Sequence, residues 1–165
     1  MDEHASATGL RVERVDFPYR RSGRRAPDRP SVLTRSVVEA VQALAATLAV
    51  PAARIAAGGR SMGGRMCSMA VAEGLPTAGL VLVSYPLHPP GRPERPRVAH
   101  FPDVSVPCLF VSGTRDRFAA RDELEAATAA IAGSVTHHWI AGADHGLGGT
   151  EEEVAAIVSD WLTTL

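Results

Sequence analysis

The sequence contains no lysine, so all 17 of its basic side chains are arginines, set against 18 carboxylates. The resulting net charge of -1 predicts no general attraction to nucleic acid or to an anionic membrane. Arginines crowd the first part of the chain, but no aromatic ladder or binding motif accompanies them, and we interpret this region as a solvated loop. These arginines are Arg11, Arg14, Arg20, Arg21, Arg24, Arg25 and Arg29.

Only two cysteines are present, Cys67 and Cys108, and neither has a second cysteine or a histidine near it at metal-ligand spacing. The sequence therefore predicts two buried thiols and neither a metal nor an organic cofactor. Residues 1–4 lack the basic start and apolar core of a signal peptide, and no apolar stretch approaches the length that spans a bilayer. We expect a reducing, cytoplasmic location without a membrane partner.

Length and hydrophobic content predict one domain over residues 1–165, because 45% hydrophobic residues are enough for a single core. Strand-like and helix-like patterns alternate along the chain, which predicts an α/β fold with a mainly parallel, doubly wound sheet and helices on both faces. Strands are expected at residues 11–17, 54–57, 79–85, 107–112 and 135–140. Helices are expected at residues 31–50 with Ser31 as N-cap, at 66–73, at 124–131 closed by Gly133, and from Thr150 onwards.

Residues 86–107 interrupt this alternation, since their prolines forbid a regular helix and no helical lid is expected. The segment leaves the carboxyl end of a central strand, where doubly wound sheets bind ligands. It is predicted either to form one wall of a site, with His88 and His100 at the entrance, or to be a stiff surface connection.

The pentapeptide Gly59-Arg60-Ser61-Met62-Gly63 stands between an apolar run and a helical pattern. This strand-turn-helix context is typical of a nucleophile elbow, in which the first glycine fits a tight turn and the second lets the helix pack closely. A phosphate-binding loop has the same first spacing but needs a lysine where Gly64 stands. A dinucleotide fingerprint needs an acidic residue at the end of the next strand, which ends in Val83-Ser84-Tyr85 instead.

Two further residues complete the order of a serine-hydrolase triad. Asp116 follows the predicted strand 107–112, and His145 follows the predicted strand 135–140. Because the carboxyl ends of parallel strands meet at one edge of the sheet, Ser61, Asp116 and His145 are expected to converge there. Asp144 adjoins the candidate base and is interpreted as a residue that shapes the loop.

With these residues the chain resembles the α/β-hydrolase superfamily, and more closely its small, lidless, dienelactone-hydrolase-like members, a group that includes the testis-expressed and acetyltransferase-complex hydrolase-like proteins. The resemblance implies Ser61 as nucleophile, Asp116 as orienting acid, His145 as base and the Met62 amide as an oxyanion donor. Substrate contacts are expected from Arg60, Tyr85 and His88. The motifs that carry the resemblance lie at residues 16–19, 58–65, 85–91, 113–116 and 142–145.

The resemblance also implies a missing part, because the family takes its second oxyanion donor from a His-Gly-rich loop after an earlier strand, and that loop and strand have no counterpart here. We expect an N-terminally shortened version of the fold, with residues 1–4 resembling the segment just after the absent loop. The absent strand should leave a gap of roughly 10 Å, which is two strand spacings. Either residues 11–17 slide inward to pair, or a second chain fills the slot, as in a homodimer.

The predicted function is hydrolysis of an ester, thioester or related acyl bond of a small molecule through an acyl-enzyme. The alternative is a hydrolase-like scaffold that binds a partner and has little or no activity, since loss of one oxyanion donor typically lowers turnover by about 100-fold to 1,000-fold.

Overall fold

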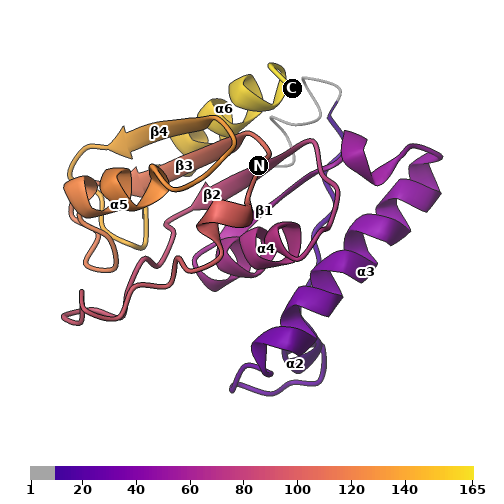
Figure 1. Cartoon of the computed structure of the whole chain (residues 1–165), viewed down its shortest axis with the longest axis horizontal. Helices are drawn as coiled ribbons and strands as arrows, with labels where there is room; N and C mark the ends of the chain where they lie inside the picture. Colours follow the sequence, from indigo (N-terminus) through magenta and orange to yellow (C-terminus); the bar gives the residue numbers. More distant parts are fainter. Residues whose placement is uncertain (1–9) are drawn as a thin grey trace.

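The computed structural model describes residues 10–165, and its centre is a four-stranded parallel sheet with strand order β1-β2-β3-β4 (Figure 1). The strands are β1 Ala56–Arg60, β2 Gly79–Val83, β3 Cys108–Gly113 and β4 Val135–Ile140. Four of the five predicted strands are therefore confirmed, with small shifts at their ends. Since each strand pairs with its neighbour in the sequence and runs in the same direction, all the strands end at one edge of the sheet.

Helices cover both faces of this sheet, as predicted (Figure 1). Their bounds are α2 Pro18–Arg21, α3 Pro30–Leu48, α4 Met62–Ala72, α5 Arg121–Thr128 and α6 Glu151–Leu162, with short 3-10 turns η1 Ala52–Arg54 and η2 Phe101–Asp103. The predicted start of α3 is off by two positions: Pro30 occupies the first turn, where its missing N–H costs nothing, and Arg29 precedes it as N-cap.

Alternate residues of the central strands belong to two separate cores. In β2, Leu80 and Leu82 pack with α3 and α4, whereas Val81 and Val83 pack with α6. In β3, Phe110 faces the first core and Val111 the second, and both are completely buried. These strands are apolar throughout because parallel strands covered on both faces have no side exposed to water.

The prediction that Gly133 closes the third helix is wrong. Helix α5 already ends at Thr128, with Ala129 as its C-cap in right-handed conformation. Gly133 instead lies where the chain passes the backbone of Val106, and an added Cβ would be 2.1 Å from the Val106 carbonyl oxygen. A close approach between two backbone segments therefore explains this glycine.

The strand predicted at residues 11–17 is also wrong, because this segment runs to α2 without joining the sheet. Its two valines are largely exposed, Val12 by 40% and Val15 by 50%, so they bury little apolar surface that would hold the segment in place. Residues 10–15 instead form one side of a groove of about 1460 Å³ along β1. Within residues 10–165, the outer edge of β1 thus has no strand partner, and inward sliding of residues 11–17 is ruled out for this structure. The expectation about residues 1–4 lies outside the described residues.

Residues 86–107 contain no α-helix, as their prolines predicted, and only the turn η2 is regular. The segment is nevertheless tied to the body of the protein near both ends. The amide of His88 donates to the Phe118 carbonyl (3.1 Å), and the carbonyl of Val104 accepts a hydrogen bond from the Ala132 amide (3.0 Å). This loop therefore lies against the segment that follows β3.

Candidate active site

Ser61 stands on a sharp turn between β1 and α4, with backbone angles φ 51 and ψ -118. Its amide donates to the carbonyl of Val83 on β2 (2.8 Å), which fixes the turn to the neighbouring strand. Gly59 is required, as predicted, because a Cβ there would be 2.9 Å from the backbone of residues 63 and 64. The prediction that Gly63 allows close helix packing is wrong, because a Cβ there would meet nothing within 4 Å. The close approach is at Gly64, where an added Cβ would lie 2.6 Å from the Gly59 carbonyl oxygen.

Asp116 follows β3 and has a completely buried side chain. Its Oδ1 accepts a hydrogen bond from the Phe118 amide (2.8 Å), while its Oδ2 lies 2.8 Å from Nδ1 of His145. A carboxylate held in this way keeps its orientation and directs the Nδ1 proton of the imidazole toward itself.

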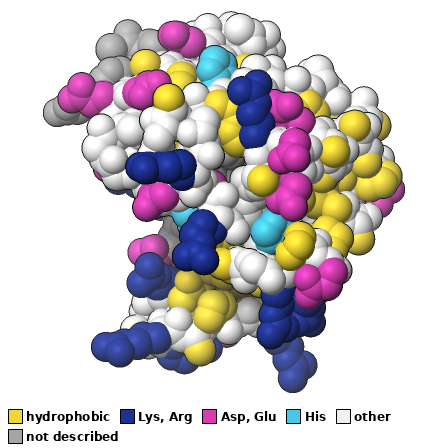
Figure 2. Space-filling model, turned by 90° about the vertical axis from the view of Figure 1, so that its left-hand side faces the viewer, with side chains coloured by type: hydrophobic (Ala, Val, Ile, Leu, Met, Phe, Trp, Pro, Cys, Tyr) yellow, Lys and Arg dark blue, Asp and Glu magenta, His cyan; other side chains and the backbone are white. Residues whose placement is uncertain are grey.

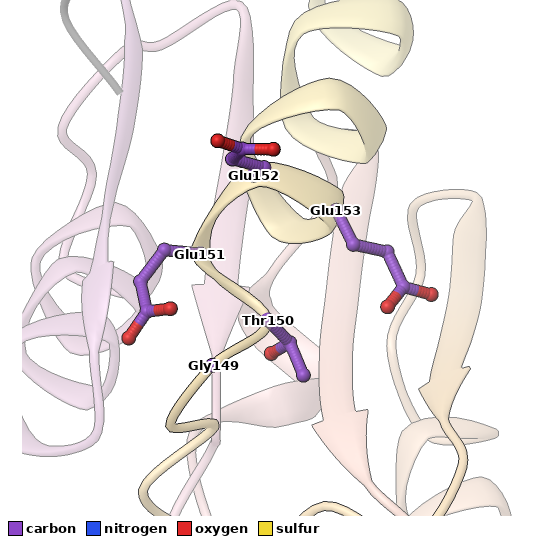
Figure 3. Close-up of a pocket in the computed structure, with 5 residues that line it drawn as sticks. All are labelled: Gly149, Thr150, Glu151, Glu152 and Glu153. Atoms are coloured by element: carbon purple, nitrogen blue, oxygen red, sulfur yellow. The ribbon is translucent and has the colours of Figure 1, made fainter.

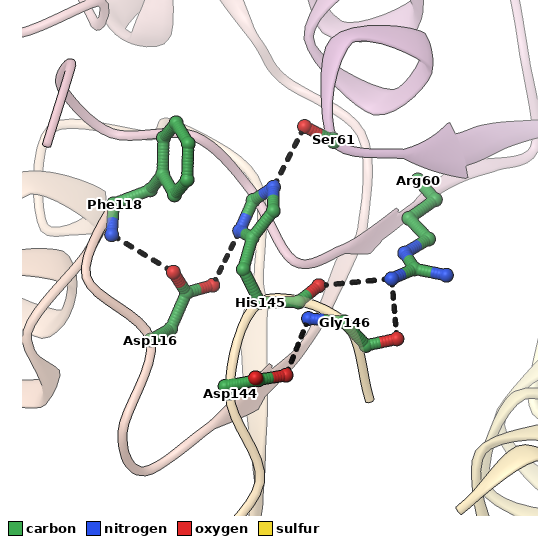
Figure 4. Close-up of polar contacts among 7 residues, drawn as sticks. All are labelled: Arg60, Ser61, Asp116, Phe118, Asp144, His145 and Gly146. Atoms are coloured by element: carbon green, nitrogen blue, oxygen red, sulfur yellow. Dashed lines mark hydrogen bonds and ion pairs between the residues drawn. The ribbon is translucent and has the colours of Figure 1, made fainter. Parts of the chain in front are cut away.

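His145 follows β4, and its side chain remains 23% exposed. Its Nε2 lies 2.9 Å from Ser61 Oγ, so the three predicted side chains form one continuous chain of hydrogen bonds (Figure 4). With the Nδ1 proton on the side of Asp116, Nε2 is free to accept the proton of the serine hydroxyl. The arrangement can thus raise the nucleophilicity of Ser61.

The loop that carries His145 has its own internal support. The carboxylate of Asp144 accepts a hydrogen bond from the Gly146 amide (2.7 Å), and it points away from the imidazole (Figure 4). This confirms the interpretation of Asp144 as a residue that shapes the loop. Leu147 is the buried side chain of the loop and belongs to the core beneath α6.

Tyr85, expected to contact substrate, is instead a core residue with 0% exposure. Its ring packs against Phe101 and Phe110, its hydroxyl donates to the Arg97 carbonyl (2.8 Å), and burial raises its pKa to about 12. The strand end that carries it turns inward, so no surface of the ring is open to a ligand.

His88 is likewise buried, at 6% exposure, rather than placed at an entrance. Its Nδ1 donates to the Pro89 carbonyl (2.8 Å) and its Nε2 to the Glu123 carboxylate (3.2 Å), and these acceptors raise its pKa. His100, the other expected entrance residue, bonds to Ser68 Oγ through Nε2 (2.8 Å), and burial lowers its pKa to about 4. Both histidines support the proline-rich loop.

Arg60 was expected to bind substrate, but its guanidinium donates to two backbone carbonyls of the loop that carries His145, residues 141–149 (the histidine loop). Nη2 lies 3.1 Å from the carbonyl oxygen of His145 and makes a second short contact with that of Gly146 (Figure 4). The guanidinium of Arg60 is thus engaged in hydrogen bonds within the protein.

Phe118 is a residue of the site that sequence reasoning missed. Its ring stacks on the His145 imidazole, with the two centroids 4.1 Å apart, and its amide holds Asp116. The Phe118 ring limits movement of the imidazole on one face, while the Asp116 carboxylate holds the imidazole at Nδ1. The only sequence signal is its place two residues after the candidate acid.

The Met62 amide is at the first position of α4, where a backbone N–H has no acceptor within the helix. The positive end of the helix dipole also lies there. The amide is therefore chemically suited to stabilise an oxyanion beside Ser61, as predicted for one half of an oxyanion hole.

Other surface features of the described residues offer less chemistry. A depression of about 380 Å³ at the start of α6 is lined by Gly149, Thr150 and three glutamates, whose carboxylates point in different directions (Figure 3). Those carboxylates already complement the helix dipole, and no nucleophile lies among them. In Figure 2, acidic side chains lie among the arginines in the upper part of the face, whereas arginines predominate at its lower end, separated by apolar side chains. The seven N-terminal arginines are all exposed.

Within residues 10–165, no three histidine, cysteine or acidic side chains are grouped so that they could hold a metal ion. No helix in this part of the chain combines the length and low polarity needed to cross a membrane. Both thiols are free and buried, as predicted, and burial raises the pKa of each to about 12.

Comparison with known proteins identifies a family that matches this chain. A family model described as an alpha/beta hydrolase domain matches residues 1–157. A putative hydrolase of the alpha/beta superfamily from Xanthomonas campestris is 22% identical, with a TM-score of 0.69 over 99% of this chain and 87% of that one.

Two further solved structures share the fold. A predicted CIB-like hydrolase from Thermoplasma acidophilum is 20% identical, with a TM-score of 0.59 over 80% of this chain. An alpha-beta serine hydrolase homologue from Coxiella burnetii is 16% identical, with a TM-score of 0.63 over 86% of this chain. The chain spans only 60% and 62% of the length of these two proteins.

Proposed function

Because the chain belongs to the alpha/beta hydrolase domain family, we propose that it is a serine hydrolase that cleaves an ester, thioester or related acyl bond of a small molecule. The observation that carries the proposal is the unbroken path from Ser61 Oγ to His145 Nε2 (2.9 Å) and from His145 Nδ1 to Asp116 Oδ2 (2.8 Å). Each distance lies within the range over which a proton is shared between heavy atoms.

In the acylation step, His145 Nε2 removes the hydroxyl proton of Ser61 as Oγ attacks the substrate carbonyl carbon. The carbonyl oxygen gains negative charge and accepts a hydrogen bond from the Met62 amide. The tetrahedral intermediate then expels the leaving group, which takes the proton from His145, and Ser61 is left acylated. Asp116 remains ionised throughout and stabilises the imidazolium.

In the deacylation step, His145 takes a proton from a water molecule as that water attacks the acyl carbon. Collapse of the second tetrahedral intermediate releases the carboxylic acid and returns the proton to Ser61.

Removing an orienting aspartate from such a triad typically lowers turnover by about 10⁴-fold, and removing an oxyanion donor by about 10²-fold to 10³-fold. No step requires a metal or an organic cofactor, and the two free thiols support a reducing, cytoplasmic setting.

The competing proposal is a scaffold of the same fold that binds a partner without turnover. It is favoured by the outer edge of β1, since no strand among residues 10–165 lies there to supply a second oxyanion amide. The two proposals differ in whether Ser61 is chemically activated.

Covalent labelling with a fluorophosphonate probe separates them. We expect the wild-type protein to be labelled at Ser61, with the site identified by peptide mass spectrometry, and the Ser61→Ala variant to carry no label. Ser68→Ala is the matched control, because Ser68 also lies 2.8 Å from a histidine nitrogen but is buried, at 1% exposure. An unlabelled wild-type protein, or label that survives Ser61→Ala, would contradict the serine-hydrolase proposal.

A further inference from the structure

The two residues hydrogen-bonded to the His145 side chain are each preceded by an arginine. Arg60 precedes Ser61 and Arg115 precedes Asp116, and both guanidinium groups donate to backbone carbonyls of the loop that carries His145. We propose that Arg60 is a positioning residue. It links the turn that carries Ser61 to the loop that carries His145, residues 141–149, and so fixes where His145 lies relative to Ser61. The catalytic consequence of this coupling depends on the proposed hydrolase function.

The histidine loop needs such support because it has little packing of its own. In the segment 141–149, most side chains are exposed or half-buried, and Leu147 is the one that is buried. A segment with few apolar contacts opens at low free-energy cost unless polar contacts hold it. The position of His145 is therefore set mainly by hydrogen bonds.

The start of the loop is held by the segment after β3. Arg115 Nε donates to the Gly142 carbonyl (2.6 Å), and the Arg115 amide donates to the Ala143 carbonyl (2.9 Å). Thr114 Oγ1 accepts a hydrogen bond from the Gly142 amide (2.8 Å). These three contacts act before the loop reaches His145, so they do not by themselves fix the imidazole.

Arg60 acts at the base itself, since its acceptors are the carbonyls of His145 and Gly146. A guanidinium bound to two successive carbonyls restricts the peptide plane between them, and this plane determines where the His145 side chain leaves the backbone. Arg60 is also adjacent to Ser61, so one side chain links the two groups that must exchange a proton. Its own side chain is exposed, and its removal leaves the core intact.

Hydrogen exchange tests the coupling without using activity. In Arg60→Met, we expect amides in the segment 141–149 to exchange about tenfold faster or more, because hydrogen bonds to charged groups are the stronger ones. Because the same hydrogen bonds are lost on global unfolding, the midpoint of urea unfolding should fall modestly, while exchange of the segment 62–72 through its own local openings should stay unchanged. Arg115→Met should have a smaller effect, since the Arg115 amide and the Thr114 hydroxyl still hold residues 142 and 143. Arg54→Met is the control, because Arg54 is exposed and its side chain makes no hydrogen bond or ion pair with another described residue.

Kinetics of Ser61 labelling test the functional consequence. We expect Arg60→Met to lower the maximal labelling rate about 10-fold to 100-fold with little change in the probe concentration that gives half that rate, since misplacing a base slows the chemical step. Arg60→Lys keeps one charged donor and should recover part of the loss. Arg54→Met should match the wild type.

The outcomes separate the two proposals. Unchanged exchange of residues 141–149 in Arg60→Met overturns the coupling, whatever the reactivity of Ser61. Faster exchange together with an unlabelled wild-type protein supports the link between the loops and contradicts the hydrolase proposal. Faster exchange with an unchanged labelling rate overturns the positioning role.

Discussion

Strands β1 and β3 each lead to a member of the candidate triad, but they are built differently. All six residues of β3 are buried, and the strand pairs on both sides, with β2 and with β4. Strand β1 consists of two alanines, two glycines and one arginine, has only Ala57 buried, and pairs only with β2 among the described residues. The nucleophile is therefore carried by the less protected strand and is held by particular contacts rather than by burial.

The largest difference between the two strands should appear in global stability. Phe110→Ala in β3 removes a ring that packs against Tyr85, Phe101 and His137, and we expect it to lower the free energy of unfolding by about 3–5 kcal/mol. Ala56→Gly in β1 should lower it by only about 0.5–1 kcal/mol. Urea denaturation of both variants measures these changes. Equal losses would mean that β1 contributes as much to the fold as β3.

A smaller effect separates two adjacent glycines at the start of α4. Gly64→Ala should lower the free energy of unfolding by about 1–3 kcal/mol and slow Ser61 labelling, because the new methyl group presses on the Gly59 carbonyl. Gly63→Ala should raise it by about 0.5–1 kcal/mol, since alanine favours a helix and the added Cβ meets nothing within 4 Å. Thermal or urea unfolding of the pair provides the measurement. A stabilising Gly64→Ala would show that close packing does not hold β1 to the helix.

The smallest effect concerns local opening. The pKa of Cys67 and of Cys108 is raised to about 12, so at pH 8 each native thiol stays protonated and reacts with a disulfide reagent only after the structure opens. Cys67 lies against β1, where its thiol donates to the Gly58 carbonyl (3.3 Å), while Cys108 is in β3. We expect Cys67 to react about tenfold faster in native buffer, measured with single-cysteine variants. Equal rates would mean that both strands open together.

Local sequence patterns were sufficient to predict the central sheet and the convergence of Ser61, Asp116 and His145, for a common physical reason. A short run of branched apolar residues such as 79–83 favours a strand buried on both faces, and residues after successive parallel strands meet at one edge. Residues 11–17 had a plausible pattern but no partner strand, and pairing is a property of the whole sheet rather than of a segment.

Side-chain orientation was harder to predict than position. Tyr85, His88 and Arg60 were correctly placed near strand ends, but each one turns toward a protein acceptor: the carbonyl of Arg97, the carboxylate of Glu123 and the carbonyl of His145. Sequence spacing carries no information about such long-range acceptors. The same limit explains why the stacking of Phe118 on His145 was missed.

The strictly sequential strand order has a consequence for how the chain matures on the ribosome. Each strand docks beside the one synthesised just before it, so the sheet grows in a single direction. Ser61 emerges 84 residues before His145, which corresponds to about 4–17 s at about 5–20 residues per second. During that interval Ser61 lacks the imidazole to which it is hydrogen-bonded in the folded chain.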